Sequence, residues 1–122
     1  MKRRVLFVDD EADLRLVIKD ALELAGYSVE VAANAREALD IQRARPSDVL
    51  VTDIFMPDGD GFEAIEGFRK EFPQAKLVII SGGAHFARGD YLAAAKLIGV
   101  DATLQKPFEI EALLGTLRAL AP

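Results

Sequence analysis

Hydrophobic residues recur along the chain with two alternating periods. Short apolar runs rich in valine, isoleucine and leucine are typical of buried strands, and five of them, the last being the weakest, span residues 5–8, 28–32, 48–52, 77–80 and 102–105. Between these runs, apolar residues recur every three or four positions, which is the pattern of a helix packed on a sheet. We expect such helices over about residues 12–25, 34–45, 61–71, 87–98 and 109–120.

Residues typical of helix ends mark two of these boundaries. Gly26 follows the first helix at the position of a C-cap glycine. Asn34, with Glu37 three residues later, has the capping-box arrangement of a helix start. The first helix is therefore expected to end before Gly26 and to face the sheet with its apolar stripe, which comprises Leu14, Val17, Ile18, Ala21, Leu22 and Ala25.

The alternation of strand and helix predicts an α/β fold, with a parallel sheet covered by helices on both faces. Runs such as "VLFV" and "LVII" are apolar throughout, as strands buried on both faces require. For five strands the common doubly wound order is 2-1-3-4-5, and the site lies at the carboxyl ends of strands 1 and 3. No linker or repeat interrupts the pattern, so residues 1–122 are expected to form a single domain.

Composition narrows the possible functions. The chain has 122 residues, of which 51% are hydrophobic, and this is enough to bury a core without cross-links. It contains no cysteine, which excludes disulfides, thiolate metal sites and cysteine nucleophiles. The net charge of -5 argues against nucleic-acid binding, and no apolar run approaches the roughly 18 residues of a membrane span. We expect a cytoplasmic domain that binds neither nucleic acid nor membrane.

Polar residues follow four of the predicted strands. Asp9 and Asp10 follow the first strand, Asp53 the third, Ser81 the fourth and Lys106 the fifth. The carboxyl ends of parallel strands meet at one edge of a sheet, where this kind of fold binds its ligands. These side chains are therefore expected to converge, although they lie far apart in the sequence. The chain predicts a site built from carboxylates, a hydroxyl and an ammonium group.

The carboxylates at this edge would repel one another. At about 5 Å and an effective dielectric constant of about 20, each pair costs roughly 3 kcal/mol, so the protein must protonate or neutralise some of them. Mg²⁺ suits this task because it is held by few carboxylates and keeps several waters. A mononucleotide or flavin site is disfavoured, since its phosphate needs a glycine- and hydroxyl-rich turn here rather than acids.

A cation and a lysine beside a carboxylate can bind an anion that the acids alone would repel, and phosphate is the natural candidate. Asp53 could then accept a phosphoryl group as an acyl phosphate. Mg²⁺ and Lys106 would neutralise charge during the transfer, and the Ser81 hydroxyl could donate a hydrogen bond to a phosphoryl oxygen. The residues alone thus favour a phosphoacceptor site.

Each of these residues also has a plainer interpretation. Asp9 and Asp10 could be an acid cluster favoured at a helix N-terminus by the dipole, and Asp53 could be a turn residue. Ser81 and Lys106 could be ordinary loop and strand-end residues. The expected convergence of all of them at one edge favours the site. His85, the single histidine, is interpreted as a solvated loop residue, so a phosphodonor histidine should belong to a partner protein.

Four pieces of the sequence resemble the receiver domains of two-component response regulators, the CheY-like family. They are "VDDE", "DIFMPDGDG", "VIISG" and "KPF", and their order and approximate spacing match over about residues 4–120. The resemblance implies a flavodoxin-like fold and a phosphoacceptor switch in a two-component system or phosphorelay, rather than a turnover enzyme. It implies a histidine kinase or histidine phosphotransfer protein as phosphodonor and a downstream protein target.

The same resemblance assigns roles to the acids. It implies that Asp53 is the phosphorylated residue and that Asp9 and Asp10 form the acidic pocket for Mg²⁺. In such domains Asp10, Asp53 and the backbone carbonyl of Phe55 would coordinate the metal ion. The resemblance thus implies a protein that needs Mg²⁺ for phosphoryl transfer.

The phosphoryl-binding and switch positions match the family in part. The resemblance implies that Ser81 and Lys106 bind the phosphoryl group, and that the peptide bond between Lys106 and Pro107 is cis, which proline permits at low cost. Thr103 stands at the switch position, where the family usually has Tyr or Phe. The stretch from Ser81 to Lys106 is a few residues longer than usual, so the switching step is expected to differ from that of the family.

Two other functions remain open from the sequence. Thr103 and the longer stretch before Lys106 would also fit a receiver-like interaction module that works without phosphorylation. A small phosphohydrolase with an aspartyl intermediate is a third possibility. Such enzymes usually carry Asp-x-Asp on one strand, however, whereas residues 9–11 read Asp-Asp-Glu.

Overall fold

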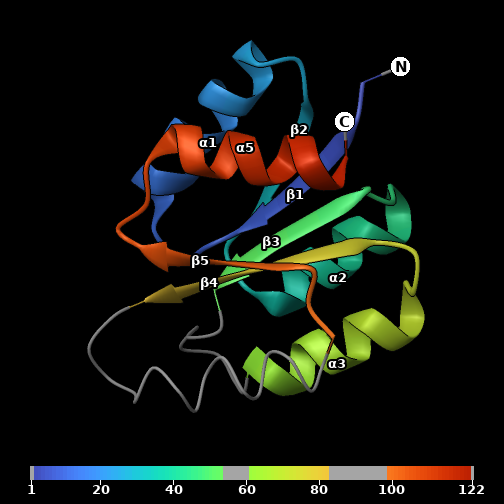
Figure 1. The fold of residues 1–122 in the computed structure, drawn as a ribbon. Helices are drawn as coiled ribbons and strands as arrows, with labels where there is room; N and C mark the ends of the chain where they lie inside the picture. The colour runs from blue at the N-terminus through green and yellow to red at the C-terminus, as the bar shows by residue number, and fades with distance from the viewer. Residues whose placement is uncertain (1, 54–60, 83–98, 122) are drawn as a thin grey trace.

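The computed structural model describes residues 2–53, 61–82 and 99–121 of the chain. Within these residues, strands far apart in the sequence form one five-stranded parallel sheet with the order β2-β1-β3-β4-β5 (Figure 1). The predicted doubly wound α/β fold and its strand order are confirmed. The strands are β1 (Arg4–Val8), β2 (Ser28–Ala32), β3 (Val49–Asp53), β4 (Lys76–Gly82) and β5 (Ala102–Lys106).

Helices cover both faces of this sheet. α1 and α5 lie on one face, and α2 and α3 lie on the other (Figure 1). Their positions agree closely with those expected from the apolar periodicity. The helix expected over residues 87–98 lies outside the described residues. The bounds of the helices are α1 (Ala12–Leu24), α2 (Ala35–Ala44), α3 (Gly61–Glu71) and α5 (Ile110–Leu120).

The central strand β1 is buried on both of its faces, which fixes where its carboxyl end lies. Phe7 packs into the cluster that contains Ile18 of α1 and Leu117 of α5. Leu6, which points to the other face, belongs to the cluster that contains Phe68 of α3. Because neighbouring residues of β1 are held in two separate cores, the residue that follows the strand, Asp9, has a well-defined position.

The end of α1 is formed as its glycine predicts. Gly26 has a φ of 100°, in the left-handed region that glycine adopts readily. Its N–H donates to the carbonyl of Glu23 at 3.0 Å, and the N–H of Tyr27 donates to the carbonyl of Leu22 at 3.1 Å. These two bonds form a Schellman motif, which ends the helix and turns the chain into β2.

The capping box at the start of α2 is also confirmed. The Asn34 side chain accepts a hydrogen bond from the N–H of Glu37 at 2.9 Å. The Glu37 carboxylate reaches back and accepts from the N–H of Ala33 at 3.2 Å, one residue before the usual partner. Backbone donors at this helix end are therefore satisfied by side chains of the helix start itself.

The predicted apolar stripe of α1 is correct at its centre and wrong at one edge. Ile18 and Leu22 are buried and Leu14 is half-buried, but Val17 is 56% exposed and Ala25 is also exposed. Adjacent residues of a helix point about 100° apart. With Ile18 directed into the core, Val17 is turned toward solvent, so the stripe that faces the sheet is narrower than expected.

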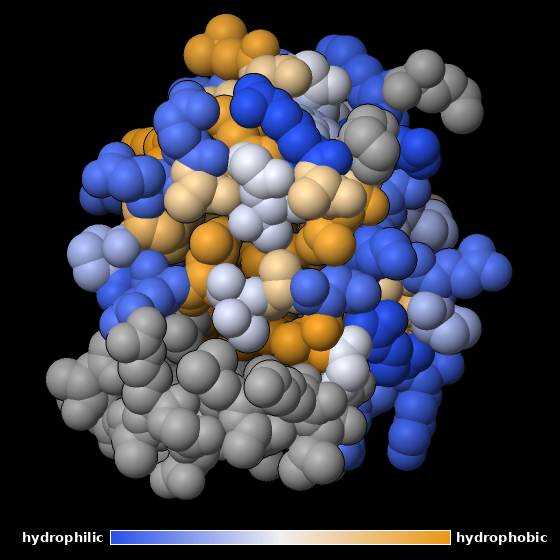
Figure 2. All heavy atoms as spheres, in the orientation of Figure 1, coloured by the Kyte–Doolittle hydropathy of each residue, from blue (hydrophilic) through white to orange (hydrophobic). Residues whose placement is uncertain are grey.

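α5 packs on the sheet through its leucines, of which Leu113, Leu114 and Leu117 are buried. Figure 2 shows this side of the molecule, where apolar and hydrophilic side chains alternate over α5 and β5. β5 is the edge strand next to β4, and its Thr103 and Gln105 are exposed. The weak apolar signal of the fifth strand thus reflects its exposed position in the sheet.

Replacing the glycine in the middle of α5 should stabilise the protein. Gly115 is exposed in a helix, and a Cβ built there meets no atom within 4 Å. We expect Gly115→Ala to raise the free energy of unfolding by about 0.5–1 kcal/mol, because alanine loses less backbone entropy on folding. Urea denaturation measures this change.

Gly26→Ala is the matched control for this prediction. Its Cβ would also meet no atom within 4 Å, but the φ of 100° strains any L-residue. We expect it to lower the free energy of unfolding by about 1 kcal/mol. Stabilisation by both substitutions would contradict the conformational explanation.

Candidate functional site

Three of the predicted site residues meet at the carboxyl edge of the sheet. The ammonium Nζ of Lys106 lies 2.8 Å from Oδ2 of Asp9 and 3.2 Å from Oδ2 of Asp53. In the sequence, Lys106 is separated from these acids by 97 and 53 positions. The sheet topology therefore assembles the cluster, as the positions after the strands predict.

The strand register explains how a single lysine reaches both acids. Val8 pairs with Thr52 across β1 and β3, so Asp9 and Asp53 are the next residues at adjacent strand ends. Gly82 of β4 pairs with Lys106 of β5, whose long side chain extends from the edge strand toward β3 and β1. The two acids thus come from the central strands, and the cation comes from the edge.

The cluster is unusually buried for its charge. The Asp9 side chain is 0% exposed, that of Asp53 is 8% exposed and that of Lys106 is 26% exposed. Buried charges need partners because desolvation penalises them strongly. Within the described residues, one ammonium group lies beside two carboxylates, so these three side chains together carry a net negative charge when ionised.

The proton of Lys106 is held firmly in this arrangement. Burial lowers the pKa of Lys106, but its hydrogen bonds to Asp9 and Asp53 and the charges of those carboxylates more than offset this effect. The pKa therefore lies above the ordinary value for lysine. At neutral pH Lys106 is a cation and both carboxylates can accept hydrogen bonds from it.

Asp9 is fixed by the backbone as well as by Lys106. Its Oδ1 accepts a hydrogen bond from the N–H of Glu11 at 2.9 Å, and its own N–H donates to the carbonyl of Ala32 at 3.1 Å. Glu11 is the N-cap residue of α1. Asp9 therefore joins the start of that helix to the charged cluster.

Asp10 does not join the ion-paired cluster, although the sequence predicts that all three acids converge. Asp10 is exposed, whereas Asp9 and Asp53 are buried. Across residues 2–53, 61–82 and 99–121, no three acidic or histidine side chains are grouped closely enough to hold a metal ion. Asp10 therefore lies next to Asp9 in the chain, but its side chain is not part of the ion-paired cluster.

The remaining candidate positions fall partly outside the described residues. Ser81 belongs to β4, next to its last residue, and its backbone pairs with Gln105. Phe55 and His85 lie outside the described ranges. Thr103 is exposed on β5, and the Lys106–Pro107 peptide bond is cis.

One residue beside the cluster was not a candidate in the sequence. Arg15, in the first turn of α1, donates from Nη1 to the backbone carbonyl of Asp9 at 2.8 Å. A signal for it exists, because a cation in the first turn of a helix opposes the helix dipole. The partner of that cation could not be predicted from the sequence, because the acceptor is a backbone carbonyl.

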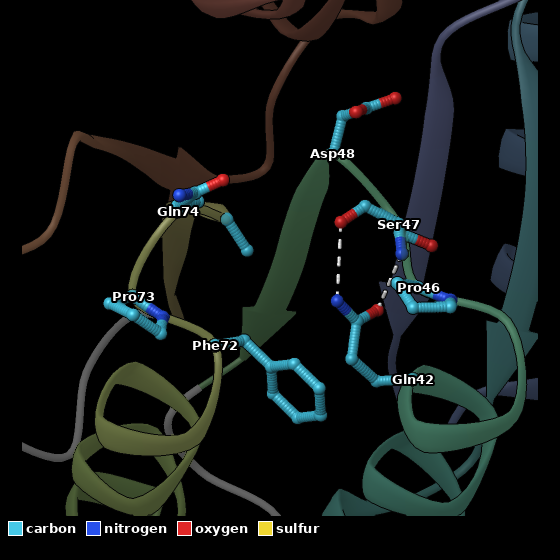
Figure 3. A pocket seen from close by; sticks show the side chains of 8 residues that line it. Gln42, Pro46, Ser47, Asp48, Phe72, Pro73 and Gln74 are labelled. Carbon is cyan, nitrogen blue, oxygen red and sulfur yellow. Dashed lines mark hydrogen bonds between the residues drawn. The ribbon is translucent and has the colours of Figure 1, made fainter.

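A separate hollow of about 450 Å³ lies at the amino ends of the strands, between the ends of α2 and α3 (Figure 3). The buried amide of Gln42 makes two hydrogen bonds there, since it donates to the carbonyl of Ser47 and accepts from the N–H of Ser47. The aromatic ring of Phe72 forms one wall. These contacts join α2 to β3 and are on the opposite edge from the charged cluster.

Comparison with known proteins identifies the family. The response regulator receiver domain family matches residues 5–118. The response regulator MprA of Mycolicibacterium vanbaalenii is 35% identical over 120 residues, which cover 98% of this chain and 51% of that protein. The chemotaxis protein CheY of Thermotoga maritima is 40% identical over 82 residues, or 66% of this chain and 68% of that protein. The chain spans about half the length of the MprA relatives.

The structure supports the same relationship. The chemotaxis protein CheY4 of Vibrio cholerae superimposes with a TM-score of 0.88 at 31% identity, covering 98% of this chain and 99% of that one. A CheY-like receiver domain protein of Methanospirillum hungatei superimposes with a TM-score of 0.89 at 30% identity, covering 98% and 93%. No helix in the described part of the chain is long and apolar enough to cross a membrane. With its family match, its strand order and its acidic carboxyl edge, the chain belongs to the receiver domains of response regulators.

Proposed function

We propose that the chain is a phosphoacceptor domain in which Asp53 receives a phosphoryl group from a phosphohistidine. The observation that carries this proposal is the ammonium group of Lys106, which lies within hydrogen-bond distance of both buried acids, Asp9 and Asp53. A carboxylate held at a strand end beside a fixed cation can act as a nucleophile toward phosphorus.

The transfer would exchange one bond to phosphorus for another. A carboxylate oxygen of Asp53 forms the new P–O bond, the P–N bond of the phosphohistidine breaks, and the imidazole of the donor keeps the electron pair and takes up a proton. Phosphoryl transfer depends mainly on positioning and on neutralising the equatorial oxygens. Lys106 would shift one of its hydrogen bonds from Asp53 to a phosphoryl oxygen, and the Ser81 hydroxyl would donate to another.

The same carboxylates fit a Mg²⁺ ion by their chemistry. Buried Asp9 and Asp53 offer hard oxygen donors, and the negative charges of the ionised pair exceed the single positive charge of Lys106. Asp9, Asp10 and Asp53, with the backbone carbonyl of Phe55, would hold the ion. When bound, Mg²⁺ would supply charge neutralisation for the phosphoryl group.

The partners and setting follow from this role. The donor would be a histidine kinase or histidine phosphotransfer protein, and a downstream protein target would bind the phosphorylated form. The chain would act in the cytoplasm as one receiver domain over residues 1–122 and would catalyse only its own phosphorylation and dephosphorylation. Phosphorylation would bias an equilibrium between two conformations rather than drive turnover of a substrate.

Incubation with acetyl phosphate and Mg²⁺, followed by intact-mass measurement, tests the proposal. We expect the wild-type chain to gain the mass of one phosphoryl group and Asp53→Asn to gain none, because its amide is a poor nucleophile. Asp20→Asn, which removes an exposed acid of α1, should gain as much as wild type.

Two outcomes would overturn the proposal. One is the absence of any gain with a donor that phosphorylates another receiver domain in the same experiment. The other is an equal gain in Asp53→Asn. Steady release of phosphate from small esters would instead indicate a phosphohydrolase. Equal affinity for a partner with and without phosphorylation would indicate a constitutive interaction module.

A further inference from the structure

Arg15 occupies a position that its charge alone does not explain. α1 begins at Ala12, so Arg15 lies in the first turn, where the helix dipole disfavours a cation. The side chain is nevertheless turned back toward the strand end, where its Nη1 donates to the carbonyl of Asp9 at 2.8 Å. The residue is half-buried, and a hydrogen bond from a charged donor is stronger than a neutral one.

This contact completes the restraint of Asp9. The N–H of Asp9 donates to Ala32, its Oδ1 accepts from Glu11, and its Oδ2 accepts from Lys106. The carbonyl oxygen is the remaining polar atom, and Arg15 holds it. Since that carbonyl belongs to the peptide unit joining Asp9 to Asp10, Arg15 restrains the direction in which the chain leaves Asp9.

Asp10 depends on this peptide unit for its position. Its side chain is exposed, and in the part of the chain described by the structure it makes no hydrogen bond or ion pair of its own. We propose that Arg15 is a positioning residue for the acidic pair, which orients the Asp9–Asp10 peptide so that Asp10 stays beside Asp9 at the carboxyl edge. This inference rests on the proposed Mg²⁺-dependent function of that edge.

The charge of Arg15 and its hydrogen bond have opposite effects on a bound cation. As a positive charge close to the acids, Arg15 repels Mg²⁺, and its removal would then tighten binding. As the group that orients the Asp9–Asp10 peptide, it favours Mg²⁺, and its removal would weaken binding. Loss of a residue that orients metal ligands typically lowers affinity by roughly 10–100-fold, so we expect weakening by about tenfold in Arg15→Met.

Mg²⁺ titration followed by backbone amide NMR shifts measures this affinity without phosphorylation. Arg15→Met removes both charge and donor, and Arg15→Lys keeps the charge but loses the planar fork of donors. Arg36→Met is the matched control, because Arg36 is an exposed arginine in the first turn of α2, at the same edge of the sheet. We expect Arg15→Lys to recover part of the affinity and Arg36→Met to bind as tightly as wild type or slightly more tightly.

A second readout separates positioning from general loss of structure. In Mg²⁺-free buffer, hydrogen exchange of the Glu11 amide, which is bonded to Asp9, should accelerate in Arg15→Met, while amides of β3 and β4 keep wild-type rates. If Arg15→Met fails to fold, the comparison of Arg15→Lys with Arg36→Met decides the question.

The Mg²⁺ affinities of these variants distinguish failure of the Arg15 positioning role from failure of the proposed Mg²⁺ site. Wild-type affinity, or tighter binding, in both Arg15 variants would overturn the positioning role while the proposed function stands. Equal weakening in Arg36→Met would also overturn it, because the effect would not be specific to the Asp9 carbonyl. Absence of Mg²⁺ binding by the wild-type chain would overturn the proposed metal site itself and this inference with it.

Discussion

Lys106→Met is expected to lower the free energy of unfolding by about 2–3 kcal/mol at neutral pH in Mg²⁺-free buffer. The substitution keeps an unbranched side chain but removes the ammonium group from beside the fully buried carboxylate of Asp9 and the largely buried carboxylate of Asp53. Removing one member of a buried ion pair typically costs about 3–5 kcal/mol. We expect the lower end of this range or less, because the Lys106 side chain is 26% exposed and water screens the charge that is lost.

Urea denaturation of both proteins measures this difference, with Lys76→Met as the matched control. Lys76 is an exposed lysine at the start of β4, at the opposite edge of the sheet. Its substitution should change stability by less than about 0.5 kcal/mol. Equal losses in the two variants would contradict a specific role for the cluster of Lys106, Asp9 and Asp53.

The stability that Lys106 contributes should also have a definite pH dependence. Its pKa is raised in the folded protein, so its contribution is fully present below the ordinary lysine pKa of about 10.4. It is lost as the pH rises through the higher, folded-state pKa. The stability difference between wild type and Lys106→Met should therefore stay constant from neutral pH to about pH 10 and shrink above it. A difference that vanishes well below that range would contradict the assignment.

Mg²⁺ offers an independent check on the same variant. A cation that binds only the folded protein stabilises it by RT ln(1 + [L]/Kd). In Lys106→Met the two carboxylates no longer share an ammonium group, so Mg²⁺ should bind more tightly and restore more stability than in wild type. A Mg²⁺ effect equal to that on wild type would indicate that Lys106 and the ion do not compete for the same charges.

The parts of the fold that could be predicted from the sequence are those set by local chemistry. Gly26 and the pair Asn34 and Glu37 marked helix ends correctly, because caps depend on a few adjacent residues. The strand order followed from the alternation of strand and helix. Val17 was wrongly placed on the packed face, because the rotation of α1 about its axis is decided by the whole core around Ile18 and not by the stripe alone.

The sequence was enough to predict which strand ends meet at the site, but not which side chains contact one another there. Asp9, Asp53 and Lys106 follow strands that the topology makes neighbours, so their convergence could be foreseen. The pairing of Lys106 with both acids depends on the register between β4 and β5 and on the reach of a long side chain. The contact of Arg15 with a backbone carbonyl left no residue-pair pattern in the sequence, so only the structure reveals it.

Phe7→Ala is expected to have the largest effect on stability, a loss of about 3–5 kcal/mol. Phe7 is fully buried in the middle of β1, pairs in register with Val31 and Val51, and packs in the cluster formed with α1 and α5. Truncation removes the whole buried ring and leaves a cavity that the surrounding structure closes only in part. A loss of this size is a large share of the roughly 5–15 kcal/mol that stabilises a typical domain.

Urea denaturation of Phe7→Ala beside Phe72→Ala separates burial from the loss of an aromatic ring. Phe72 follows the end of α3, is only half-buried and touches Phe68 at 5.1 Å between ring centroids. It should therefore cost much less, about 1 kcal/mol. Phe7→Leu should recover most of the loss, since leucine refills much of the cavity. Similar losses in Phe7→Ala and Phe72→Ala would contradict the explanation from burial.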